Sequence, residues 1–148
     1  MRNKIAGRNE RGAALVELAI GSTVFFTLVF GVLEFSRLLW THNALADATR
    51  RGARYAAVNS QNVSNVQNFV VYGVASPTGS EPALVSGLTT SNVQVTYSNF
   101  GVKLGTATVS ITGYQFKFVV PLIGGSLTMP AYRTTLTGEC AGYWPPDI

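Results

Sequence analysis

The sequence predicts an α+β protein, in which a long N-terminal transmembrane helix extends out of the membrane and carries a small antiparallel β-sheet on its distal half. Residues 13–33 are apolar apart from Glu17, and helical spacing continues from there to residue 58. Beyond residue 90, apolar and polar residues alternate in short segments, as in strands with one buried face. The predicted divisions are a basic cytoplasmic leader (1–12), a transmembrane helix (13–39), an extension of that helix (40–58) and an extracytoplasmic β-rich domain (59–148).

The composition is typical of an exported or membrane-attached protein. Charged residues make up 12% of the 148 positions and hydrophobic residues make up 47%. A soluble domain usually carries about twice that share of charged residues. If the apolar segment spans a membrane, about 110 residues remain outside it, which is enough for one modest core.

The net charge of +4 arises mainly from the N-terminal tail. Beyond residue 12 the chain has seven Lys or Arg and six Asp or Glu residues, so this larger part is nearly neutral. A nucleic-acid-binding protein would gather basic residues on its folded part, and we expect no nucleic acid partner. The basic residues of the tail are Arg2, Lys4, Arg8 and Arg11, and Glu10 is the acidic residue among them. By the positive-inside rule, this tail stays in the cytoplasm.

Residues 13–33 are long enough to cross a bilayer. At about 1.5 Å of rise per residue they form a helix of roughly 31 Å, close to the thickness of the hydrocarbon core. The basic tail then places the rest of the chain outside the bacterial inner membrane, in the periplasm of a two-membrane cell. Trp40, with Arg37 and His42 nearby, is expected at the outer interface, where amphipathic rings gather.

A cleaved secretory signal peptide is the alternative for this segment. Its apolar run exceeds the usual 7–15 residues, and an acidic residue within the run is atypical of signal peptides. "ALADA" at 44–48 offers small residues for cleavage. The helical pattern of "ADATRRGARYAA" at 46–57 runs through that point, however, which favours a helix that is retained.

The segment 34–58 is expected to continue the helix beyond the membrane. It contains no proline and a single glycine, Gly52. Two pairs of opposite charge stand at helical spacing, Glu34 with Arg37 and Asp47 with Arg51. An apolar stripe along one side can pack on another element, and its members are Ala44, Leu45, Ala48, Ala53, Ala56 and Ala57. The polar cluster at 58–65 ends the helix.

Short strands are predicted in the C-terminal half. Residues 66–76 are ambiguous but keep a three-four spacing that fits a helix, and residues 77–87 form a loop. Alternating segments at 92–98, 106–118 and 131–139 predict three strands, and 121–130 is expected to be a connection. The apolar positions change parity at Gly113, which predicts a β-bulge there. A sheet with one apolar face needs a cover, and the apolar stripe of the long helix can supply it.

The residues do not predict catalysis, a metal site or a cofactor. Zinc would need several His or Cys ligands, and the chain contains one of each, His42 and Cys140. His42 is interpreted as a residue of the membrane interface. Cys140 is expected to be a free thiol, with an intermolecular bridge or a lipid attachment as alternatives. The carboxylates beyond the membrane segment are scattered, and we therefore expect no enzyme.

Glu17 is the most informative residue of the apolar segment. In one interpretation it is a tolerated glutamate that reaches the cytoplasmic interface, about 7 Å away. In the other, a peptidase cuts after Gly12, and the new ammonium group of Ala13 lies one helical turn from Glu17. Buried charges persist when they are paired. Glu17 would then neutralise that ammonium in its own chain or in a neighbouring subunit, and would set the register between helices.

These residues resemble a known family. "RGAALVELAI", with Gly12 and Glu17, is similar to the processing motif of type IV prepilins and pseudopilins. The larger pattern resembles the TadE-like proteins, which are pilin-like components of tight-adherence (Flp) pilus systems. The resemblance is carried by residues 11–17, by "GVLEFSR" at 31–37 and by residues 46–57.

The resemblance implies a non-enzymatic pilin-like protein that an inner-membrane prepilin peptidase cuts between Gly12 and Ala13, with Glu17 as the docking residue. Major Flp pilins are very short and usually have tyrosine after the glutamate, whereas this chain has Leu18 and a sizeable extra domain. A minor pilin or an assembly factor is therefore expected. Its partners would be the inner membrane, the peptidase, other pilins and the assembly platform, in a homo- or hetero-oligomer.

Two questions stay open at the level of the sequence. The chain could instead be an uncleaved single-pass envelope protein whose outer domain binds or senses a ligand. The basic cluster of Arg50, Arg51 and Arg54 is either a solvated helix face or a subunit contact.

Overall fold

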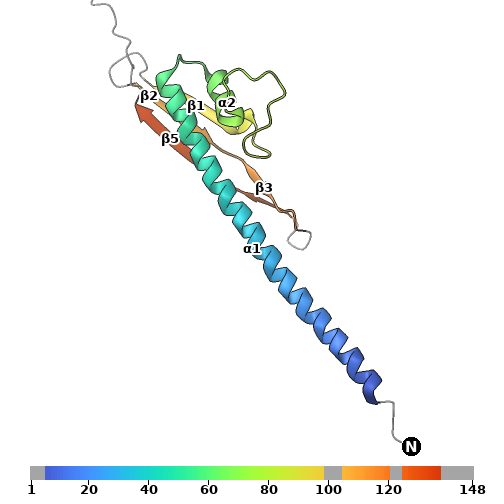
Figure 1. Cartoon of the computed structure of the whole chain (residues 1–148). Coiled ribbons are helices and arrows are strands. Elements are labelled where there is room, and N and C mark those ends of the chain that lie inside the picture. Colours follow the sequence, from blue (N-terminus) through green and yellow to red (C-terminus); the bar gives the residue numbers. More distant parts are fainter. Residues whose placement is uncertain (1–5, 99–104, 121–124, 138–148) are drawn as a thin grey trace, which may run out of the picture.

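The computed structural model describes residues 6–98, 105–120 and 125–137. The longest element described is helix α1 (Ala6–Val58), which runs for 53 residues, or about 80 Å at the usual helical rise. The other elements gather beside the distal half of α1, and its N-terminal half extends away from them (Figure 1). Within the described residues, Gly12–Val58 is long and apolar enough to cross a membrane. The predicted α+β architecture is confirmed.

A second helix, α2 (Val63–Tyr72), packs on α1. Asn62 begins it, because its side-chain oxygen accepts a hydrogen bond from the Asn65 amide at 3.2 Å and so satisfies a free helix-end donor. Gly73 ends it in the left-handed region (φ +79°), and its N–H donates to the Phe69 carbonyl. The helical interpretation of the ambiguous segment is confirmed, although the helix begins three residues before the predicted start.

Three antiparallel strands form the main sheet in the order β1-β2-β5. They are β1 (Val93–Ser98), β2 (Thr106–Ile111) and β5 (Tyr132–Thr137), and a 3₁₀ turn at Thr90–Asn92 leads into β1. Every second residue of β2 is buried, as the alternating pattern predicts for a strand covered on one face. α1 provides the cover, since it packs on both β2 and β5.

A two-stranded ribbon of β3 (Gln115–Lys117) and β4 (Ser126–Thr128) continues the β2–β5 pair. The bulge predicted at Gly113 is wrong. Ile111 pairs with Tyr132 and Gln115 pairs with Thr128, so three residues separate the pairs on each strand and neither strand has an extra one. Instead, on both strands the buried positions switch between odd- and even-numbered residues at this point. Gly113 accommodates this reversal with a positive φ of 69°.

β4 lies within the segment predicted to be a connection. All three of its residues are exposed, so the strand has no alternation of buried and exposed positions that periodicity could detect. The first part of that predicted connection, residues 121–124, lies outside the described residues, as does Cys140.

The core lies between the distal half of α1, α2 and the main sheet. The apolar stripe predicted on α1 is confirmed: Leu45, Ala48, Ala53 and Ala56 are fully buried, and Ala44 and Ala57 are partly buried. Small side chains on α1 allow its backbone to approach its neighbours closely. The closest approach is at Gly52, where an added Cβ would overlap with Cγ2 of Val70 on α2.

Candidate functional site

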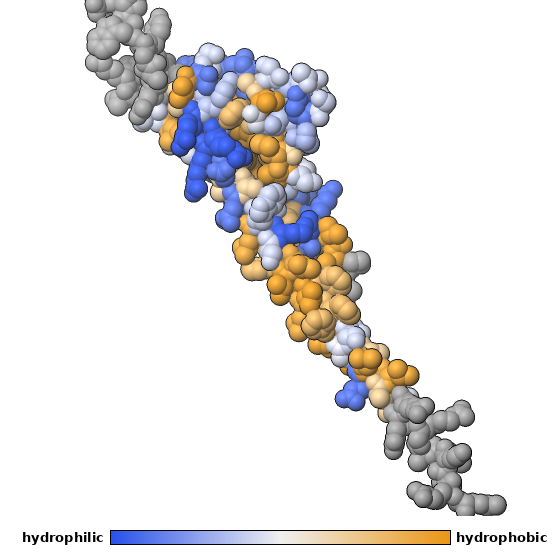
Figure 2. Space-filling model, viewed as in Figure 1, coloured by the Kyte–Doolittle hydropathy of each residue, from blue (hydrophilic) through white to orange (hydrophobic). Residues whose placement is uncertain are grey.

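The N-terminal half of α1 presents an apolar surface that the rest of the described chain leaves uncovered. Hydrophobic residues dominate the part of the surface between the N-terminal end and the folded domain (Figure 2). Two threonine hydroxyls in this half are satisfied locally, because Thr23 donates to the Ala19 carbonyl at 2.8 Å and Thr27 to the Thr23 carbonyl at 2.7 Å. Such a surface suits lipid or other apolar helices.

Glu17 lies exposed near the start of this surface. Two shallow grooves flank it, and small side chains contribute to both: Ala14, Gly21 and Ser22 to one, and Gly12, Ala13 and Gly21 to the other. Small residues beside a polar group let another helix approach closely within a membrane. The surroundings of Glu17 can therefore accommodate the backbone of a neighbouring helix.

The predicted cleavage bond, between Gly12 and Ala13, lies inside α1. A protease that binds its substrate in an extended conformation would first have to unwind this turn. Glycine weakens a helix by about 1 kcal/mol relative to alanine, and an added Cβ at Gly12 would meet no atom within 4 Å. The glycine thus lowers the cost of local unwinding and has no packing role among the described residues.

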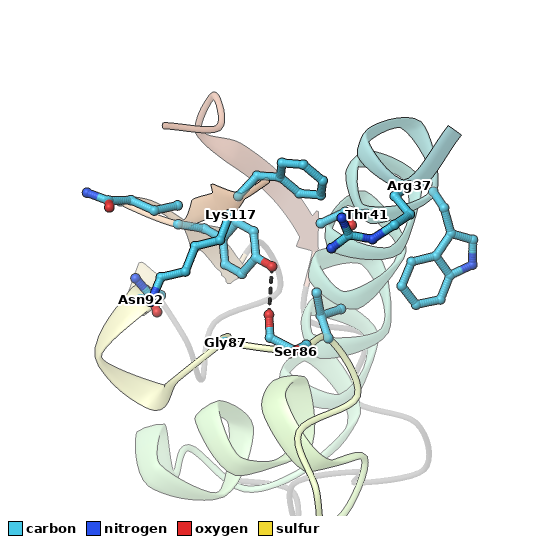
Figure 3. Close-up of a pocket in the computed structure, with 12 residues that line it drawn as sticks. Arg37, Thr41, Ser86, Gly87, Asn92 and Lys117 are labelled. Carbon is cyan, nitrogen blue, oxygen red and sulfur yellow. Dashed lines mark hydrogen bonds between the residues drawn. The ribbon is translucent and has the colours of Figure 1, made fainter. Parts of the chain in front are cut away.

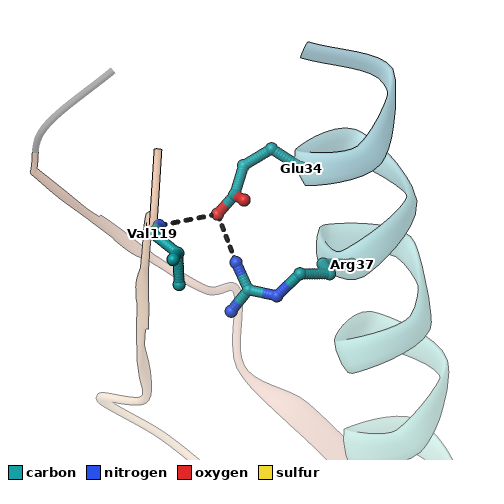
Figure 4. A network of polar contacts seen from close by, with 3 residues as sticks. All are labelled: Glu34, Arg37 and Val119. Atoms are coloured by element: carbon teal, nitrogen blue, oxygen red, sulfur yellow. Dashed lines mark hydrogen bonds and ion pairs between the residues drawn. The ribbon is translucent and has the colours of Figure 1, made fainter. Parts of the chain in front are cut away.

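Glu34 connects α1 to the β3 end of the ribbon (Figure 4). Its carboxylate accepts a hydrogen bond from the Val119 backbone N–H at 3.0 Å and pairs with Arg37 on the same helix. The Glu34 side chain is only 5% exposed, and these two donors compensate its removal from water. The predicted Glu34–Arg37 pair is confirmed. Arg37 also stacks on the ring of Phe116, with its guanidinium carbon 5.1 Å from the ring centroid.

Replacing Glu34 by alanine is expected to release the backbone near Val119. The Val119 N–H would lose its acceptor, so we expect its hydrogen exchange to become several-fold faster in the detergent-solubilised full chain. Asp47→Ala is the matched control, because Asp47 forms the other ion pair on the same helix, with Arg51, and lies away from Val119. Unchanged exchange at Val119 in Glu34→Ala would contradict this role.

His42 lies exposed on α1 and contacts the sheet, and its position at a membrane interface stays a prediction. Its Nδ1 lies 2.7 Å from the Tyr132 hydroxyl, and the two rings meet edge to face. Burial raises the pKa of the Tyr132 hydroxyl above its ordinary value of 10.0, so it remains a neutral phenol that can hydrogen-bond to the imidazole. The contact attaches β5 to α1.

A groove of about 500 Å³ opens between α1, β3 and the loop that precedes β1. Arg37 on α1 and Lys117 on β3 lie on opposite sides of it, with Ser86, Gly87 and Asn92 along its lower rim (Figure 3). Tyr114 donates a hydrogen bond to the Ser86 carbonyl at 2.7 Å and fixes the loop. The groove places two cationic side chains close to the end of the domain from which the N-terminal half of α1 extends.

The three arginines predicted as a cluster lie exposed on the distal half of α1, where hydrophilic residues dominate much of the visible surface (Figure 2). Arg51 pairs with Asp47 at 2.6 Å, as expected from the spacing. Within the described part of the chain, Arg50 and Arg54 have no ion-pair partner. Beside them lies a groove of about 460 Å³, lined by the stacked rings of Tyr55 and Phe69, 4.5 Å apart.

Comparison with known protein families assigns most of helix α1 to a family. Residues 12–54 match the TadE-like protein family. This segment is TadE-like. No curated protein and no solved structure matches the chain. The family match indicates a pilin-like, generally structural role associated with the Tad pilus.

The TadE-like segment contains all the predicted site residues but separates them into two groups. Gly12, Ala13 and Glu17 lie at one end of the helix, and the arginines begin at Arg50, about 50 Å away at the usual helical rise. Glu34 lies between the two groups. Its contact with Val119 could not be found from the sequence, since the donor is a backbone amide 85 residues away and amides are common to nearly all residues.

Proposed function

We propose that the chain is a minor pilin or assembly factor of a Tad pilus system, matured by a prepilin peptidase that cuts after Gly12. The observation that supports this most is the coincidence of the TadE-like match with α1. The first half of this helix leaves an apolar surface uncovered, and Glu17 is the one acidic residue within the apolar segment 13–33. A helix of this kind can be held in a membrane and later pack against other helices in a pilus.

The proposed topology has residues 1–12 in the cytoplasm and the folded domain outside the inner membrane. The four basic residues of the leader support this orientation. We place the outer end of the span near Leu33, not at residue 39. Glu34 is already buried against Val119 of the domain, and the domain therefore contacts one face of α1 from that residue onward.

In this proposal Glu17 binds the terminus that cleavage creates. Cleavage leaves an ammonium group on Ala13, which adds a positive charge at the membrane edge. Helical side chains lean towards the N-terminus, so the Glu17 carboxylate can reach the ammonium of its own chain. The grooves beside Glu17 also admit a neighbouring helix, and the same carboxylate can pair with that neighbour's terminus. Either pairing lowers the cost of keeping both charges in a dry interface.

Glu17→Gln tests this role while keeping the size of the side chain. The variant should still insert into the membrane, because it removes a charge from the apolar segment. The Ala13 ammonium would be left unpaired, and we expect about tenfold or greater loss of partner pilins that co-purify with the chain from membranes. Thr27→Val, which lies exposed on the same helix but lines neither groove beside Glu17, is the control and should retain them. Equal recovery with Glu17→Gln and wild type would overturn the role of Glu17.

A further inference from the structure

We infer that the β3–β4 ribbon makes a second contact with the membrane, in which Val119 enters the outer lipid interface beside α1. The inference rests on the proposed function for one point, the placement of the membrane span at residues 13–33. It adds a lipid-binding surface on the folded domain, separate from the spanning helix.

The direction of the chain after β3 is fixed by two contacts with α1. Phe116 lies against Arg37, and three residues later the Val119 N–H binds Glu34 at 3.0 Å. Moving from Arg37 to Glu34 is a step of about 4.5 Å along the helix towards the apolar segment. The chain therefore descends towards the membrane from Phe116 to Val119, and it reaches the level of the first residue beyond Leu33 (Figures 1 and 4).

The side chains at this level have the character of an interface. Val119 is 73% exposed, although it is apolar. Its backbone N–H is already satisfied by Glu34, so placing Val119 among lipids leaves no unpaired donor at that position. On α1, Phe35 is also an exposed apolar residue near the same level, and the exposed Leu39 and Trp40 follow within about two helical turns further out.

Two basic side chains lie just outside this apolar level. Arg37 and Lys117 both line the groove between α1 and β3, within about one helical turn of Glu34 on α1 and two residues of Val119 on the ribbon. Long basic side chains keep their heads at the headgroup level while their stems lie along apolar surface, where anionic lipid attracts them. The apolar residues are continuous with the uncovered surface of the span, which makes lipid the occupant we propose.

Spin labels in the full chain test the contact. Single cysteines would be introduced at residues 119, 28 and 137 in a Cys140→Ser background, and the labelled chains reconstituted singly in nanodiscs of phosphatidylethanolamine and phosphatidylglycerol. Leu28 lies exposed in the proposed span. Thr137 is the exposed end of β5 and lies at the edge of the sheet far from the membrane. The collision rates of each label with oxygen, which partitions into lipid, and with a water-soluble nickel chelate would be compared.

The label at residue 119 is expected to favour oxygen over nickel, like the label at 28, with a ratio several-fold above that at 137. High nickel accessibility at 119 would show that Val119 faces water and would overturn the inference alone. Low accessibility to both reagents would show that protein covers it, with the same consequence. If the label at 28 is itself accessible to nickel, the proposed span fails, and the membrane contact of the ribbon fails with it.

Discussion

Gly12→Leu is expected to abolish removal of the leader. In cells that contain a prepilin peptidase, the wild-type chain extracted from membranes should begin at Ala13, whereas the variant should keep its intact N-terminus. Leucine favours the helix by almost 1 kcal/mol over glycine at this position, so the turn that must unwind is stabilised, and its side chain also fills the space next to the bond to be cut. Intact mass and N-terminal sequencing measure both outcomes, and pilus assembly should be lost with processing.

The control for this experiment is Gly21→Leu. Gly21 is another helical glycine with no atom within 4 Å of an added Cβ, but it lies nine residues beyond the predicted cleavage point. It should be processed like the wild type. A wild-type chain that keeps Met1 in cells with an active peptidase would overturn the cleavage proposal and favour an uncleaved single-pass envelope protein. Normal processing and piliation of Gly12→Leu would contradict the assignment of the site.

Gly52→Leu should have the largest effect on the stability of the folded domain. Gly52 is buried where α1 meets α2, and even one added carbon would overlap with Val70 and stand 3.4 Å from Val109 Cγ1. Val70 is itself only 1% exposed and β-branched, so it has little freedom to move away. Overpacking of this kind costs about 1–3 kcal/mol. We expect leucine to lower the free energy of unfolding by about 3 kcal/mol, and alanine by about 1 kcal/mol after its gain in helix propensity.

Urea unfolding of the domain in the detergent-solubilised full chain measures this effect. Gly31→Leu is the matched control, since Gly31 lies on the same helix and an added Cβ there would meet no atom within 4 Å. The control should leave the urea midpoint unchanged. A midpoint for Gly52→Leu equal to that of the wild type would mean that α2 can shift away from α1 without loss of stability.

The architecture could be predicted from periodicity because burial follows it closely. The alanine stripe of α1 is the buried face, and the alternating residues Ala107, Val109 and Ile111 of β2 all point into the core. The ends of β1 and β5 fall within two residues of the predicted segments. Local patterns suffice for such elements, since each one has a continuous apolar face that must be covered.

The reversal of the buried face at Gly113 could not be predicted from the sequence of one strand. A change of parity along β2 and β3 is compatible with a bulge or with a reversal of both strands. A bulge and a reversal differ only in the opposite strand. There the buried residues are Met129 and Tyr132, which lie three positions apart. That comparison requires the register, which depends on pairing across more than 20 residues of chain.

The contacts of the candidate sites likewise divide into those that helix spacing predicts and those that it cannot predict. The spacing of charges on α1 predicted the Glu34–Arg37 and Asp47–Arg51 pairs, because both depend only on helix geometry. The contacts of Glu34 with Val119 and of His42 with Tyr132 join segments 85 and 90 residues apart. Helical spacing carries no information about such partners. Gly12, Ala13 and Glu17 remain predictions that the proposed experiments address.

The position of Glu34 also determines how the protein can be divided. By hydropathy alone, a soluble fragment would start near residue 40, after the apolar helix. Such a fragment would lack the acceptor for the Val119 N–H and the Arg37 side chain that covers Phe116. Part of the domain's own structure is therefore encoded in the last turns before that cut. A fragment intended to retain the whole fold should begin no later than Leu33, and it will carry exposed apolar residues as a consequence.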